Sequence, residues 1–181
     1  MICEALESGR WRLSFPEPEA YFVVNVMAQL ARHYQQDVAQ LPPTQRAYWL
    51  GQGSLPPGTM TPPGTGTKPR ELQSAEEILA DARLELRSER LALAENWIRE
   101  FEATGKRDPW SIEISSAERD EFLAMINDRR LLVALDHGIT EADMDADPGQ
   151  IEDEARRSAI LEIYFLGRFI FTAIGPQIYR P

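Results

Sequence analysis

Residues 159–174 read AILEIYFLGRFIFTAI, an almost uninterrupted apolar stretch near the end of this 181-residue chain. Apolar side chains on nearly every side are typical of a helix that is buried on several faces. The stretch contains Glu162 and Arg168 and falls short of the roughly 20 apolar residues that span a bilayer. It therefore predicts a central core helix, with Phe165 in the interior, and no membrane segment.

Three further helices are expected upstream of this one, over residues 18–38, 74–103 and 116–137. In each of them apolar residues recur at intervals of three and four, which is the pattern of an amphipathic helix. In the second, the phase of the apolar residues slips near residues 84–88, so we expect a bend or a break there. Gly138 follows the third and is the expected C-terminal stop.

Two short segments share the pattern Trp-x-apolar-x-apolar, and each is followed by a predicted helix. They are residues 11–15 (WRLSF) and 110–114 (WSIEI). An isolated strand leaves its backbone groups without partners, so the two are expected to pair as a small ribbon. The predicted fold class is mainly α: four to five helices packed around the apolar C-terminal helix, with a small two-stranded β ribbon.

Residues 51–69 read GQGSLPPGTMTPPGTGTKP, with five glycines and five prolines. Proline removes a backbone donor and glycine raises the entropy of the unfolded chain, so neither helix nor strand is favoured. The sequence therefore predicts a single helical domain over residues 1–181 with an inserted, flexible Pro/Gly-rich loop at 51–69.

The charge distribution argues against nucleic-acid binding. The chain has 19 basic and 29 acidic side chains, for a net charge of −10. Residues 1–70 carry +1, residues 71–140 carry −7 and residues 141–181 carry −4, whereas affinity for nucleic acid depends on basic groups that neutralise phosphates. The first twenty residues have several glutamates and no secretory signal, so we expect a cytoplasmic protein.

Motifs for catalysis and cofactor binding are missing. The sequence has no Gly-rich phosphate loop, no zinc-ligand spacing and no hydrolase nucleophile elbow. Its single cysteine is Cys3, and its two histidines, His33 and His137, lie on different predicted helices. We predict no catalytic residue, no cofactor and no metal site.

An acidic segment over residues 143–154, DMDADPGQIEDE, has carboxylates at the positions of calcium ligands in an EF-hand loop. The sixth loop position needs a residue with positive φ, but Pro148 stands there and its ring forbids that conformation. A divalent-cation-binding module is an alternative function, although we expect a solvated acidic loop without a specific calcium site.

Asn127, Asp128 and Arg130 lie amid apolar residues of the third predicted helix. Polar groups placed there need partners if they are buried. We interpret the three as a structural polar cluster, in which Asp128 pairs with an arginine of a neighbouring segment. The alternative is an enzyme or small-ligand binder with a polar site at these residues.

These residues also carry a resemblance to a known family. Ile112, Ile114 and Glu118, followed by Asn127-Asp128-x-Arg130-Leu131, resemble its pattern of a short strand, an acidic helix cap and a helix containing N-D-x-R-L. Leu13, Glu19 and Ala20, at the entry of the first helix, also match. The family is a domain of unknown function in small, mainly helical proteins, common in actinobacteria and often encoded near the Clp protease adaptor ClpS. The resemblance implies the helical fold and an association with proteolysis or its regulation.

Together these observations favour a non-enzymatic, cytoplasmic helical protein that acts through protein–protein contact in a regulatory role. An unidentified protein is the expected partner, with neither nucleic acid nor membrane involved.

Overall fold

The computed structural model describes residues 1–50, 70–104 and 109–178, so the predicted loop at 51–69 lies outside the described residues. The fold is mainly helical with one small antiparallel sheet, which confirms the predicted class of a mainly α fold with a small β element. The helices are α1 (Glu17–Gln35), α2 (Pro43–Leu50), α3 (Arg70–Thr104), α4 (Ser116–His137), α5 (Glu141–Met144) and α6 (Glu154–Ile178), and the strands are β1 (Ile2–Ala5), β2 (Trp11–Phe15) and β3 (Trp110–Ile114).

The two Trp-containing segments pair as expected, since β2 and β3 are antiparallel with Leu13 opposite Ile112 and Phe15 opposite Trp110. The sheet also has a third strand that the sequence did not predict. β1 pairs with the other edge of β2, with Cys3 opposite Leu13. Most residues of β1 are exposed, so the strand lacks the alternating apolar pattern that marks a half-buried strand.

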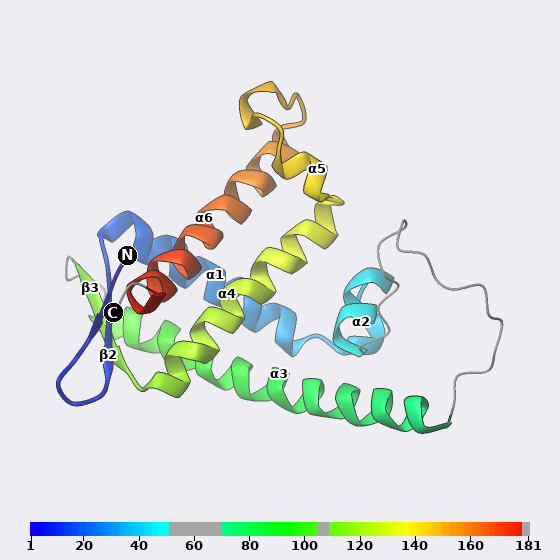
Figure 1. The fold of residues 1–181 in the computed structure, drawn as a ribbon, viewed down its shortest axis with the longest axis horizontal. Helices are drawn as coiled ribbons and strands as arrows, with labels where there is room; N and C mark the ends of the chain where they lie inside the picture. Colours follow the sequence, from blue (N-terminus) through cyan, green and yellow to red (C-terminus); the bar gives the residue numbers. More distant parts are fainter. Residues whose placement is uncertain (51–69, 105–108, 179–181) are drawn as a thin grey trace.

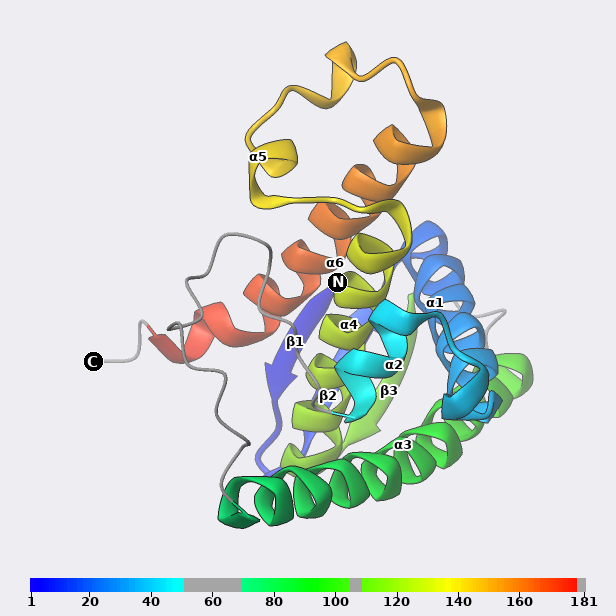
Figure 2. The ribbon, with the colours of Figure 1, turned by 90° about the vertical axis from the view of Figure 1, so that its right-hand side faces the viewer.

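The helices form two packed pairs beside the sheet. α1 lies against α3, and α4 lies against α6, which runs back along it after the turn at the top of Figure 1. In Figure 2, α2 sits between α4 and α3, and it contacts both. The sheet lies near one end of this assembly, close to the N-terminus (Figure 1).

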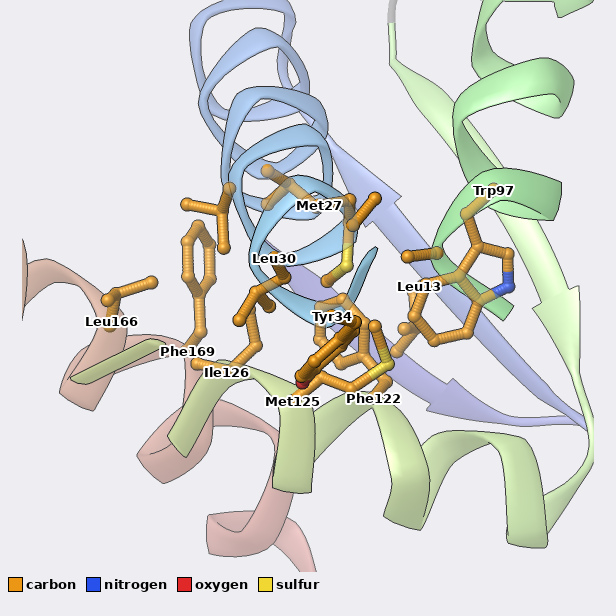
Figure 3. Packing of buried hydrophobic residues seen from close by; sticks show 14 of the residues in the cluster. Leu13, Met27, Leu30, Tyr34, Trp97, Phe122, Met125, Ile126, Leu166 and Phe169 are labelled. Atoms are coloured by element: carbon orange, nitrogen blue, oxygen red, sulfur yellow. The ribbon is translucent and has the colours of Figure 1, made fainter. Parts of the chain in front are cut away.

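The core is built where the pairs and the sheet meet. Figure 3 shows side chains of α1, α4 and α6 converging with Leu13 of β2 and Trp97 of α3. Phe15 is fully buried among aromatic rings of three other elements. Its ring centroid lies 5.5 Å from that of Trp110, 6.2 Å from Phe122 and 6.1 Å from Phe169. Aromatic packing therefore joins the sheet to α4 and α6.

α4 begins and ends where its local sequence dictates. The hydroxyl of Ser115 accepts from the backbone N–H of Glu118, whose carboxylate accepts from the backbone N–H of Ser115. This backbone hydrogen bond lowers the pKa of Glu118. Gly138 ends the helix with φ of +58°, a left-handed conformation that glycine adopts at little cost.

α3 continues through residues 84–88 without the expected break. The apolar phase slips there because two arginines, Arg87 and Arg90, occupy the inward face and are 4% and 8% exposed. In the sequence, buried polar side chains therefore interrupt the spacing of apolar residues, although the helix itself continues.

The expectation that α6 is buried on several sides is also wrong. Its inward face contains Ile160, Ile163, Leu166, Phe169 and Ala173. Another face is apolar but exposed, and Phe165 is only partly buried, with its ring 4.6 Å from that of Phe22. An all-round apolar pattern does not distinguish a central helix from one with an apolar face left uncovered. None of the helices in the described residues combines the length and apolar content that a membrane crossing needs.

Two phenylalanines of α6 test this placement. Phe169 is 3% exposed and Phe171 is 71% exposed. We expect Phe169→Ala to lower the free energy of unfolding by about 3–5 kcal/mol, because a buried ring is lost, and Phe171→Ala to change it by less than about 0.5 kcal/mol. Chemical denaturation of both variants measures the difference. Equal losses would contradict the orientation of α6.

Candidate functional site

Among the residues that the structure describes, the carboxylate of Asp128 on α4 is a buried polar group with three hydrogen-bond donors, and the residue is 3% exposed. Its Oδ2 accepts from the Tyr34 hydroxyl at 2.8 Å and from Arg90 Nη1 at 2.7 Å. Its Oδ1 accepts from the Tyr48 hydroxyl at 2.8 Å. We call these four residues the Asp128 network. It joins α1, α2, α3 and α4 at one carboxylate, and Arg90 is the arginine of a neighbouring segment that the sequence led us to expect.

The charges in this network compensate one another. Burial disfavours the guanidinium of Arg90, but Asp128 and a hydrogen bond to Glu121, 3.0 Å from Arg90 Nε, outweigh it and raise the pKa of Arg90. Burial raises the pKa of both tyrosines, and the negative charge of Asp128 adds to this effect. A carboxylate can only accept hydrogen bonds, so each tyrosine must keep its hydroxyl proton in order to donate one. Tyr34 and Tyr48 are therefore neutral in this network.

A second set of contacts surrounds His33 at the C-terminal end of α1. The indole Nε1 of Trp49 donates to His33 Nε2 at 2.8 Å. Arg87 donates to the backbone carbonyls of His33 and Gln36, and its guanidinium carbon lies 5.5 Å from the Trp49 ring centroid. A cation at the last carbonyls of a helix is favourable. Through these contacts of Trp49 and Arg87, α2 and α3 pack against the C-terminal end of α1.

Asn127 and Arg130 do not join Asp128. Arg130 Nη1 is 3.5 Å from the amide oxygen of Asn127, which is a long contact. Arg130 lies against Gly167 of α6, and its buried Nε has no hydrogen-bond partner within the described residues. The three predicted residues therefore serve different interfaces. The sequence predicted an arginine partner for Asp128 but did not indicate which one, and it gave no signal for the two tyrosines, because Tyr34, Tyr48 and Arg90 are dispersed along the chain.

Two carboxylates of the acidic segment, those of Asp143 and Asp147, form local caps. Asp143 accepts from the backbone N–H and the hydroxyl of Thr140 and pairs with Arg156, each at 2.7 Å. The hydrogen bond from Arg156, followed by those from Thr140, lowers the pKa of Asp143. Asp147 accepts from the backbone N–H of Gly149 at 2.9 Å. Within residues 1–50, 70–104 and 109–178, no three His, Cys, Asp or Glu side chains are grouped to hold a metal ion.

The fold and the Asp128 network define the class of protein: a small, mainly helical domain with a three-stranded antiparallel sheet, in which four helices meet at one buried carboxylate. The family model described as a domain of unknown function (DUF2017) matches residues 3–170, and the chain belongs to this family. The matched region includes all four residues of the Asp128 network. No curated protein and no solved structure matches the chain significantly.

The environment of His33 predicts a pH dependence of stability. Burial, with the nearby positive charge of Arg87, lowers the pKa of His33 to about 4, whereas an unfolded histidine has a pKa of about 6.5. Between these values the unfolded chain binds a proton that the folded chain does not. The free energy of unfolding should therefore decrease as the pH falls from 6.5 towards 4.

Urea denaturation between pH 6.5 and 5 measures this contribution, since few carboxylates titrate in that interval. His33→Gln keeps an acceptor for Trp49 and should flatten the pH profile. His137→Gln, at an exposed position of α4, should keep the wild-type slope. A His33→Gln profile as steep as that of the wild type would show that His33 is not the group responsible.

Proposed function

We propose that the chain is a non-enzymatic protein that acts through protein–protein contact, and that the contact surface is the exposed apolar face of α6. Leu161, Tyr164, Phe171 and Ile174, which we call the α6 stripe, are 51%, 45%, 71% and 40% exposed. They are spaced three or seven residues apart, so they line one side of the helix over about 20 Å. Exposed apolar residues that line one face of a helix are more typical of an interaction site than single apolar residues scattered over a surface.

The charge within the stripe indicates the chemistry of the partner. Arg168 lies between Tyr164 and Phe171, is exposed, and forms no ion pair within the described residues. An amphipathic helix fits this surface, with apolar side chains against the stripe and a carboxylate opposite Arg168. A second copy of the chain fits poorly, because its antiparallel docking would bring two Arg168 side chains together and each copy carries a net charge of −10.

The polar alternatives receive less support. Both oxygens of Asp128 are taken by Tyr34, Tyr48 and Arg90, which leaves this carboxylate unsuited to bind a substrate. In the acidic segment, Asp143 and Asp147 are engaged in local caps, and the described residues contain no group of three possible metal ligands there. We further propose a regulatory role in the cytoplasm, linked to proteolysis in actinobacteria. This part of the proposal follows from the gene neighbourhood near the Clp adaptor ClpS that the family resemblance implies.

Site-specific crosslinking tests the surface. A photoreactive phenylalanine analogue is placed at Phe171 in one protein and at Ile78 in another. Ile78 is a matched control, since it is apolar and 68% exposed but lies on α3. Crosslinks in native lysate specific to position 171 identify the partner by mass spectrometry, and calorimetry then measures its affinity for the purified chain.

We expect Phe171→Ser and Arg168→Glu each to weaken this affinity at least tenfold, which is about 1.4 kcal/mol, and Ile78→Ser to leave it unchanged. Identical crosslinks at both positions, or an affinity insensitive to Phe171→Ser, would contradict the proposal. So would a stable homodimer in sedimentation experiments that Phe171→Ser dissociates, because the stripe would then be occupied by the chain itself.

A further inference from the structure

A polar pocket of about 680 Å³ opens where α1 ends against α2 and α4. Its volume lies within the range of about 300–1,000 Å³ that is usual for small-molecule sites. Its lining includes Arg32 and His33 of α1, Gln45 of α2, and Arg129 and Asp136 of α4. Nothing in the proposed contact through α6 uses this pocket.

Parts of the pocket wall are held in place by bonds to the interior. Gln45 is 7% exposed and donates to Asp136. His33 is held by Trp49, and the backbone behind it is held by Arg87. These contacts fix the wall before any ligand arrives, and a preformed site loses less entropy when it binds.

Three residues of the pocket lining offer hydrogen-bond donors, namely Arg32, His33 and Arg129. Because Nε2 of His33 accepts a hydrogen bond, the neutral ring carries its proton on Nδ1. Arg129 uses Nε to bind Glu162 at 2.6 Å, and its two terminal nitrogens keep their N–H groups. Arg32 has no hydrogen-bond or ion-pair partner within the described residues, and it adds five further N–H donors.

The pocket contains one arginine, Arg32, whose charge no acidic side chain offsets within the described residues, whereas Arg129 is paired with Glu162. The pocket lining has two guanidinium groups and one carboxylate, whereas the chain as a whole has a net charge of −10. Guanidinium groups and amide donors recognise carboxylate and phosphate oxygens. We propose that this pocket binds a small metabolite through an anionic group, a carboxylate or a phosphate, with Arg32 as the principal cationic contact and Arg129 and His33 as further donors.

Titration calorimetry on the full chain tests this site, with inorganic phosphate and succinate as separate probes at constant ionic strength. The test variant is Arg32→Gln, and the matched control is Arg99→Gln. Both arginines are exposed on helices, and Arg99, on α3, is not among the residues that line the pocket. Thermal melting of each variant confirms that the fold is retained.

We expect a saturable one-to-one isotherm with at least one probe, weakened tenfold or more by Arg32→Gln and unchanged by Arg99→Gln. Saturation with phosphate alone identifies a phosphate ligand, and saturation with succinate alone identifies a carboxylate. Isotherms that do not saturate with either probe would overturn the proposal. Equal weakening by both substitutions would do so too, since it would show only general attraction of anions to surface arginines.

Discussion

The arrangement of the helices depends on the buried carboxylate of Asp128. A carboxylate removed from water is unfavourable unless charges and donors replace its hydration. Here one guanidinium and two hydroxyls do so, and each comes from a different helix. α1, α2 and α3 are therefore held against α4 by hydrogen bonds that converge on one buried carboxylate. Apolar packing drives association of these helices, and we infer that the network favours the register in which its four groups meet.

Much of the fold is readable in the sequence because the signals are local. The pairing of β2 with β3 follows from two short alternating segments, and α4 is bounded by a capping box and by Gly138. The features that were not predicted depend on distant residues. β1 forms only because β2 offers a free edge, and α3 stays continuous because its buried arginines find partners on other helices. The exposed face of α6 has the same apolar composition as its buried face, so composition alone could not separate them.

In the candidate sites, too, local features were predictable from the sequence and contacts between distant residues were not. A partner for Asp128 was predictable in kind, because an acid amid apolar residues needs a cation or donors. The identity of that partner was not predictable, since Arg90 is 38 residues away from Asp128 in the sequence. The polar pocket collects glutamines and arginines that carry no motif. It is connected to α6 through one pair, Arg129 with Glu162, and Glu162 directly follows Leu161 of the α6 stripe. This ion pair therefore joins the pocket to α6 at a residue beside the α6 stripe and outside it.

A double-mutant cycle between Arg90 and Asp128 tests most directly whether this network holds the helices together. Arg90→Met leaves the buried carboxylate of Asp128 without a cation and should lower the free energy of unfolding by about 3–5 kcal/mol. Asp128→Asn leaves Arg90 paired with Glu121 alone and should cost less, and the double variant contains neither buried charge. We expect the double variant to lose less than the sum of the single losses by at least about 1.5 kcal/mol. The exposed pair Arg12–Glu113, joined at 2.6 Å, is the control, with an expected coupling below about 1 kcal/mol. Additive losses at Arg90 and Asp128, within about 0.5 kcal/mol, would contradict the central role of the carboxylate.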